Sequence, residues 1–135
     1  MSNRDDIVNK LKQYGVSPTT QRVEIAQILF ARPQHLSAEQ ISKMVNDESS
    51  ATVSKATIYN TLGLFAKKGL VKEVIVDPSK VFYDSNITNH FHFYNIDTGT
   101  LTDIPLKEVS FNELPELPEG TVSSGLEVIV RIKNS

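Results

Sequence analysis

Histidine provides the most distinctive chemistry of this sequence, because the 135 residues contain only three copies: His35, His90 and His92. His90 and His92 lie two positions apart in a run of alternating aromatic residues, which predicts a β-strand. Side chains two apart on a strand point to the same face, so both imidazoles would be available to one metal ion while Phe91 and Phe93 point into the core. Taken alone, the pair is more simply interpreted as two half-exposed strand residues.

Two carboxylates lie where they could complete such a site. Asp84 follows an expected strand at residues 81–83, and Asp103 lies near the end of an expected strand at residues 100–104. Three imidazoles and two carboxylates suit Fe²⁺, Mn²⁺ or Zn²⁺, whereas the absence of cysteine excludes thiolate metal sites, thiol catalysis and disulfides. Two histidines with one carboxylate also form the facial triad of non-haem iron oxygenases, so the residue types alone leave an enzyme open.

Four helices and a hairpin are predicted in the first half of the chain. Apolar periodicity, caps and helix breakers give approximate limits for the helices: residues 7–15, 18–33, 37–45 and 55–68. The third begins at Ser37–Gln40, a sequence typical of a capping box, in which residues three apart cap each other. A strand at residues 70–76, a turn at 77–80 and a return strand at 81–83 follow, which is the order of elements in a winged helix.

The helix from Lys55 to Lys68 has one face suited to the major groove of DNA. On a helical wheel its residues divide into a buried and an outward set: Ile58, Leu62 and Phe65, against Ala56, Tyr59, Asn60, Gly63 and Lys67. Tyr59 can contact a thymine methyl group or a phosphate, Asn60 can pair with an adenine edge, and Lys67 suits a phosphate. The alternative is an ordinary surface helix with a glycine that lowers its stability.

The second half of the chain predicts a small sheet with one short helix. Its elements are three strands, at residues 90–94, 100–104 and 126–132, and a helix at residues 108–114. The boundary between the halves falls near residues 85–89. Residues 1–84 carry a charge balance of +2 and residues 85–135 one of −4, which fits a DNA-binding module attached to a separate acidic body.

The composition limits the class of protein. Hydrophobic residues make up 39% of the chain, which is typical of a globular protein, and no apolar run is long enough to span a membrane. The first six residues, Met1–Asp6, lack the apolar segment of a signal peptide. We therefore expect a cytoplasmic protein without a membrane partner.

The order and spacing of several motifs resemble those of the ferric uptake regulator family. The motifs cover nearly the whole chain: Pro18–Arg22, His35–Ile41, Ser54–Leu62, Lys68–Val71, Val81–Asp84 and Asn89–Phe93. This resemblance implies an α+β fold, with a winged-helix DNA-binding domain at residues 1–84 and an α/β dimerisation and metal-sensing domain at residues 85–135. It also implies metal ligands at His35, Asp84, His90, His92 and Asp103, and a base-contacting tyrosine at Tyr59. Together with the outward face of the helix, this gives the predicted DNA contacts: Arg22, Lys55, Ala56, Thr57, Tyr59, Asn60, Gly63 and Lys67.

Several residues depart from the pattern of many family members. Paired Cys-x-x-Cys motifs for structural zinc are absent, and Asn60 follows the tyrosine where many members have arginine. The Tyr59–Leu62 sequence resembles the iron response regulator branch, some of whose members sense iron through haem. Phe91 interrupts the histidine run often found in that branch, and no Cys-Pro haem motif exists. Asp103 lies eleven residues after His92, as in the peroxide-sensing branch.

These observations predict a homodimeric, metal-responsive transcriptional regulator that is not an enzyme. We expect a repressor that binds double-stranded DNA at a palindromic A·T-rich operator. The expected cofactor is Fe²⁺ or Mn²⁺, and Zn²⁺ can occupy such a site in purified protein. The alternatives are a haem-responsive regulator of the same family, a non-haem iron enzyme, and a winged helix that contacts proteins instead of DNA.

Overall fold

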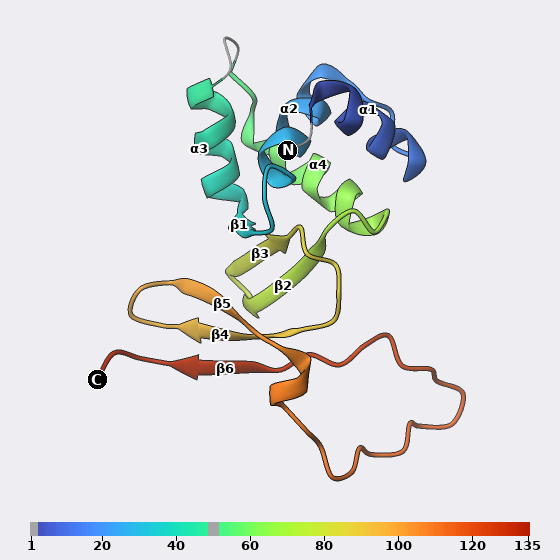
Figure 1. Cartoon of the computed structure of the whole chain (residues 1–135), viewed down its shortest axis with the longest axis vertical. Coiled ribbons are helices and arrows are strands. Elements are labelled where there is room, and N and C mark those ends of the chain that lie inside the picture. The colour runs from blue at the N-terminus through green and yellow to red at the C-terminus, as the bar shows by residue number, and fades with distance from the viewer. Residues whose placement is uncertain (1–2, 49–51) are drawn as a thin grey trace. The chain divides into compact units, whose positions relative to one another are not determined.

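The chain forms two compact units in the computed structural model, which describes residues 3–48 and 52–135. The first unit comprises residues 1–87 and the second residues 88–135. The elements of the first unit, labelled in Figure 1, are α1 (Arg4–Gln13), α2 (Thr20–Leu29), β1 (His35–Ser37), α3 (Ala38–Glu48), α4 (Lys55–Lys67), β2 (Lys72–Asp77) and β3 (Lys80–Asp84). Those of the second are β4 (Phe91–Asn95), β5 (Thr100–Ile104), the 3₁₀ turn η1 (Leu106–Glu108) and β6 (Ile129–Ile132).

Local capping interactions explain where the helices of the first unit begin. The side chains of Asn3, Thr19 and Ser54 each accept a hydrogen bond from a backbone N–H in the first turn of α1, α2 and α4. The predicted capping box is confirmed, because the Ser37 backbone N–H donates to Gln40 Oε1 at 2.9 Å and the Gln40 N–H donates to Ser37 Oγ at 3.2 Å. These bonds satisfy N–H groups that have no partner within the helix.

A three-stranded antiparallel sheet in the order β1-β3-β2 completes the first unit. The hairpin β2–β3 is the predicted wing. The strand β1, which begins at His35, was not among the predicted elements; it has only three residues and is defined by its pairing with β3. In this pairing His35 lies opposite Asp84, Leu36 opposite Tyr83 and Ser37 opposite Phe82.

The core of the first unit is formed mainly by the apolar faces of its helices. Ile58, Leu62 and Phe65 of α4 have no exposed surface, so the predicted buried face of this helix is confirmed. They belong to one apolar cluster with residues of α1, α2 and α3, including Ile7, Val23 and Ile41. Burial of each such side chain stabilises the fold by about 1.5–3 kcal/mol, which fixes α4 with its opposite face toward solvent.

The second unit is a three-stranded sheet in the order β5-β4-β6, with β5 antiparallel and β6 parallel to the central strand. The predicted helix at residues 108–114 is wrong: η1 ends at Glu108, and no regular element occurs from there until β6 begins at Ile129. Pro115 and Pro118, which cannot donate a backbone hydrogen bond, oppose helix formation in this segment. The last strand is also shorter than the predicted range of 126–132.

Phe91, which lies between the two histidines, and Phe93, which follows them, differ in their environment. Phe91 is buried and meets Phe111 edge to face, with the ring centroids 6.2 Å apart. Phe93 is 37% exposed, so the expectation that it points into the core is wrong. Its register partner Val130 is 39% exposed, which shows that no described residue of this unit covers that part of the sheet.

Within the described part of the chain, no helix is both long and apolar enough to cross a membrane.

Candidate metal centre and nucleic-acid interface

The first unit contributes a histidine and a carboxylate that lie side by side. His35 of β1 and Asp84 of β3 are register partners, and each offers a ligand atom within 4.8 Å of the other's. Asp84 is almost fully buried, and its Oδ1 accepts a hydrogen bond of 2.9 Å from the Asn86 backbone N–H. The buried Asp84 carboxylate and the neighbouring imidazole are ligand types that divalent first-row metal ions accept.

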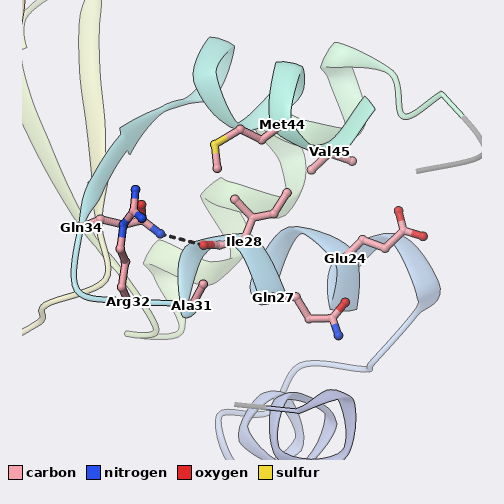
Figure 2. A pocket seen from close by; sticks show the side chains of 8 residues that line it. All are labelled: Glu24, Gln27, Ile28, Ala31, Arg32, Gln34, Met44 and Val45. Atoms are coloured by element: carbon pink, nitrogen blue, oxygen red, sulfur yellow. Dashed lines mark hydrogen bonds between the residues drawn. The ribbon is translucent and has the colours of Figure 1, made fainter. Parts of the chain in front are cut away.

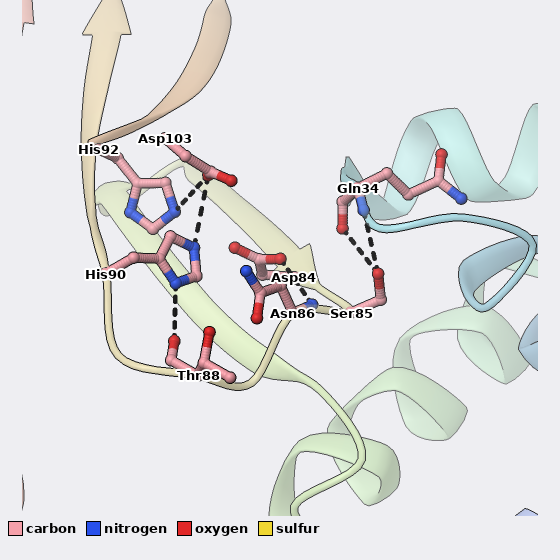
Figure 3. A network of polar contacts seen from close by, with 8 residues as sticks. All are labelled: Gln34, Asp84, Ser85, Asn86, Thr88, His90, His92 and Asp103. Atoms are coloured by element: carbon pink, nitrogen blue, oxygen red, sulfur yellow. Dashed lines mark hydrogen bonds and ion pairs between the residues drawn. The ribbon is translucent and has the colours of Figure 1, made fainter. Parts of the chain in front are cut away.

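Two hydrogen bonds form a clamp between Gln34 and Ser85, which Figure 3 shows. The Gln34 backbone N–H donates to Ser85 Oγ at 3.1 Å, and the Ser85 backbone N–H donates to the Gln34 carbonyl at 2.9 Å. Each clamp residue adjoins a ligand, so these bonds fix the ends of β1 and β3 beside the site. This contact could not be predicted from a local sequence pattern, because its two residues are 51 positions apart.

The Gln34 side chain also ties β1 to the end of α2. Its amide donates to the Ile28 carbonyl at 2.7 Å and to the Leu29 carbonyl at 3.3 Å. It lines a cavity of about 300 Å³ between α2 and α3, seen in Figure 2, together with Glu24, Gln27, Ile28, Ala31, Arg32, Met44 and Val45. This cavity contains a single carboxylate and no histidine, so its chemistry differs from that of a metal site.

The second unit brings three potential ligands together. His90 Nε2 lies 3.4 Å and His92 Nε2 lies 3.5 Å from the same atom, Asp103 Oδ1 (Figure 3). The two imidazoles meet edge to face with their centroids 4.6 Å apart. The β4–β5 register places His92 directly opposite Asp103, which explains why residues eleven positions apart converge.

The hydrogen bonding of His90 prepares it to bind a cation. Its Nδ1 lies 2.7 Å from the carbonyl oxygen of Thr88, and a carbonyl can only accept, so Nδ1 carries the proton. In the neutral ring Nε2 then presents a lone pair toward the oxygen of Asp103. A cation bound between this nitrogen and the Asp103 oxygen, which lie 3.4 Å apart, would be stabilised by both. A histidine whose outer nitrogen donates to a carbonyl is the usual arrangement of a metal ligand.

The distances within this cluster agree with shared coordination. Two ligands that lie about 2.1 Å from a tetrahedrally coordinated ion are about 3.4 Å apart. The Nε2 atoms of His90 and His92 lie at 3.4 and 3.5 Å from Asp103 Oδ1. Each imidazole nitrogen is therefore spaced from Asp103 as two ligands of one divalent first-row metal ion would be, and the donor set excludes a thiolate-bound soft metal.

Most of the predicted DNA-contacting residues lie on the exposed face of α4. Lys55, Ala56, Tyr59, Asn60, Gly63 and Lys67 are all exposed on α4. Apart from the neighbouring backbone of α4 itself, no described atom lies within 4 Å of where a Cβ on Gly63 would be, so the helix surface is open at that point. Thr57 is only partly exposed, and its backbone N–H is capped by Ser54. The Arg22 guanidinium, also partly exposed, donates to the Ser17 carbonyl at 3.1 Å.

The first unit is a winged helix with an exposed outer face on α4, and the second unit contains clustered nitrogen and oxygen ligands. This combination is typical of the class of metal-responsive winged-helix transcription regulators. The sequence model of the ferric uptake regulator family matches residues 13–119. The chain belongs to this family. It is 30% identical over 115 residues to a peroxide-responsive repressor, PerR, of Staphylococcus aureus, and the match covers 85% of this chain and 76% of that protein.

Solved structures of similar proteins show the same fold. The ferric uptake regulator of Vibrio cholerae is 22% identical, with a TM-score of 0.71, and the match covers 94% of this chain and 98% of that one. The ferric uptake regulator of Pseudomonas aeruginosa, solved with manganese, is 23% identical with a TM-score of 0.67, and the match covers 93% and 96%. These relatives are regulators of transcription and not enzymes, which removes the non-haem oxygenase alternative.

Proposed function

We propose that this protein is a homodimeric repressor that binds a palindromic A·T-rich operator when a divalent metal ion is bound. In this proposal residues 1–84 are the DNA-binding domain and residues 85–135 sense the metal and pair two chains. The observation that carries the proposal is that His90 and His92 both approach one oxygen of Asp103, in a chain that has the fold of the ferric uptake regulators.

We propose that one ion is shared by both units through His35, Asp84, His90, His92 and Asp103. The first unit supplies two of these ligands and the second supplies three, so neither half alone provides five. An ion that needs both halves favours the state in which they meet. To convert a mostly open population into a closed one, the ion must prefer the closed state by roughly 5 kcal/mol, which several ligands contributed across the two units can provide.

Fe²⁺ or Mn²⁺ is the expected physiological ion. Imidazole and carboxylate ligands suit both, and Zn²⁺ binds the same donors and can replace them in purified protein. Relatives were solved with manganese, from Pseudomonas aeruginosa, and with iron, from Francisella tularensis. Haem is the weaker candidate, because the clustered histidines share a carboxylate oxygen and neither stands alone as an axial ligand.

The second unit provides the reason to expect a dimer. It buries four large apolar side chains: Phe91, Tyr94, Leu101 and Ile104. Ten others are exposed: Phe93, Ile96, Leu106, Phe111, Leu114, Leu117, Val122, Leu126, Val130 and Ile132. A module of this size with so small a core needs a partner to be stable, and a second copy would supply one. The resulting two-fold axis would present two α4 helices to a palindrome.

The test is metal-dependent DNA binding. Metal-free protein is titrated into a fluorescently labelled, palindromic A·T-rich duplex with and without Mn²⁺, at constant salt because phosphate contacts dominate affinity. A scrambled duplex of the same composition controls for non-specific binding. We expect a rise in anisotropy that requires both Mn²⁺ and the palindrome, and that His92→Ala weakens at limiting Mn²⁺. Equal binding with and without Mn²⁺ would contradict the metal-driven closure.

A further inference from the structure

A hydrogen bond on the outer surface of the first unit links α4 to the start of α3. The Tyr59 hydroxyl donates to Glu39 Oε1 at 2.6 Å, a length typical of a hydrogen bond to a carboxylate. Tyr59 lies in the middle of the exposed face of α4 and is 48% exposed. Glu39 lies in the first turn of α3 and is also exposed. The bond therefore fixes the tyrosine on the surface where DNA contacts are expected.

The electrostatic surroundings keep Glu39 ionised. The Tyr59 hydrogen bond is the main cause that lowers the pKa of the Glu39 carboxyl, with smaller contributions from its own backbone and from the charges of Lys55 and Lys80. The same bond raises the pKa of the Tyr59 hydroxyl, which stays protonated. At neutral pH the pair is a carboxylate that accepts and a phenol that donates.

This pairing determines what Tyr59 can offer to a base. A phenol has one proton, and here Glu39 holds it, so the Tyr59 oxygen can only accept further hydrogen bonds. In the major groove, the amino groups of adenine and cytosine are donors, whereas guanine presents the acceptors N7 and O6. An accepting Tyr59 oxygen thus matches adenine or cytosine and not guanine or a phosphate.

We propose that Glu39 is a positioning residue that determines base specificity, because it holds Tyr59 as a hydrogen-bond acceptor toward adenine or cytosine in the operator. This inference rests on the proposed DNA-binding function. One net hydrogen bond to a base changes the preference at that position about three- to tenfold. The carboxylate also repels phosphates, so it lowers the affinity for all DNA while it sharpens the choice of sequence.

Selection from a randomised duplex library tests the proposal. The full-length wild type with Mn²⁺ is compared with three variants, Glu39→Ala, Glu39→Gln and Tyr59→Phe, and sequencing gives the base preference at each position. The position that Tyr59 reads is the one at which Tyr59→Phe loses its preference. Glu39→Gln is the conservative control, because its amide oxygen still accepts the phenol proton while the charge is gone. Glu113→Gln, in the exposed segment of the second unit, controls for a general loss of charge.

The proposal predicts how each variant changes the base preference and the affinity for non-specific DNA. Glu39→Ala loses the adenine or cytosine preference at that position by about three- to tenfold, and Glu39→Gln keeps it. Both bind non-specific DNA more tightly than the wild type, whereas Glu113→Gln does not. A wild-type preference in Glu39→Ala, an equal loss in Glu39→Gln, or no effect of Tyr59→Phe overturns the inference alone. Failure of the wild type to enrich any sequence, with or without Mn²⁺, overturns the proposed function and the inference with it.

Discussion

Replacement of Asp103 by asparagine changes one proposed ligand with little effect on the shape of the protein. The Asp103 side chain is 48% exposed near the end of β5, so the substitution opens no cavity. The amide has the same size as the carboxylate but carries no charge. Because both His90 and His92 point at Asp103 Oδ1, the change affects the point where the ligands of the second unit meet.

The expected loss of metal affinity follows from the charge removed. A divalent ion and a carboxylate charge about 2.2 Å apart attract each other by about 4 kcal/mol, even at the dielectric constant of water. The amide oxygen of the variant can still coordinate weakly, which retains part of this energy. We therefore expect the Kd for Mn²⁺ to rise by about 10- to 1000-fold, which corresponds to about 1.4–4 kcal/mol.

The assay is competition between metal-free protein and a chromogenic chelator for Mn²⁺, followed by absorbance. Co²⁺ serves as a second probe, because its visible absorption reports the ligands around it. Unfolding by urea in the absence of metal shows whether the fold is intact, and we expect a change within about 0.5 kcal/mol, as for a typical surface substitution.

Asp97→Asn is the matched control. Asp97 is an exposed carboxylate in the turn of the same hairpin, where its Oδ2 accepts the Asn134 backbone N–H at 2.9 Å. It lies at the opposite end of the hairpin from Asp103. We expect this variant to bind Mn²⁺ like the wild type. If Asp103→Asn also binds Mn²⁺ with unchanged Kd and Co²⁺ spectrum, the cluster is not a metal site and the reasoning from its geometry is refuted.

Three further substitutions or conditions test other parts of the structure. Gly63→Ala should raise the free energy of unfolding, measured in urea, by about 0.5–1 kcal/mol, because the new Cβ meets no atom within 4 Å outside the backbone of α4 and alanine favours helix. The affinity for operator DNA, measured by anisotropy, should fall. Unchanged affinity would show that this face does not approach DNA. Ser85→Ala removes the hydroxyl that accepts the Gln34 N–H, and it should weaken Mn²⁺ binding about tenfold in the chelator assay, as for other residues that support ligands. Wild-type affinity in this variant would show that the clamp does not support the metal ligands. The lowered pKa of Glu39 means that the folded state stabilises the carboxylate form of this side chain. The resulting gain in the free energy of unfolding is therefore complete at pH values above the pKa of Glu39 in the unfolded chain, and it is lost as the pH falls through the pKa of Glu39 in the folded protein. The unfolding free-energy difference between wild type and Tyr59→Phe should be constant from about pH 6 to 9 and shrink below about pH 4.5; a difference independent of acid pH would contradict the bond.

Features encoded by neighbouring residues could be predicted from the sequence. The capping box at Ser37 and Gln40 is a pattern of residue types three positions apart, and its two hydrogen bonds are present. The buried face of α4 follows from the helical repeat in the same way. The two histidines both approach Asp103, as the prediction of one shared face required, although His90 immediately precedes β4 and does not lie within it.

Features that depend on distant residues could not be predicted in this way. The strand β1 exists because three residues pair with β3, about fifty positions later, and no periodicity marks so short a segment. The Tyr59–Glu39 bond joins two helices whose packing the sequence does not state. Phe93 follows the alternation of a strand, but alternation assigns two faces and does not tell which of them is covered.

The connection lengths in the second unit favour formation of the β4–β5 hairpin before β6 docks. The strands β4 and β5 are joined by residues 96–99 alone, whereas β6 reaches β4 only after residues 105–128 have closed into a loop. Short hairpins form within about 1–10 μs, and long-range parallel pairing is slower. His92 and Asp103 face each other as soon as this hairpin closes. The residues proposed to sense the ion in the finished protein can therefore fix the strand register of a newly made chain before its last strand docks.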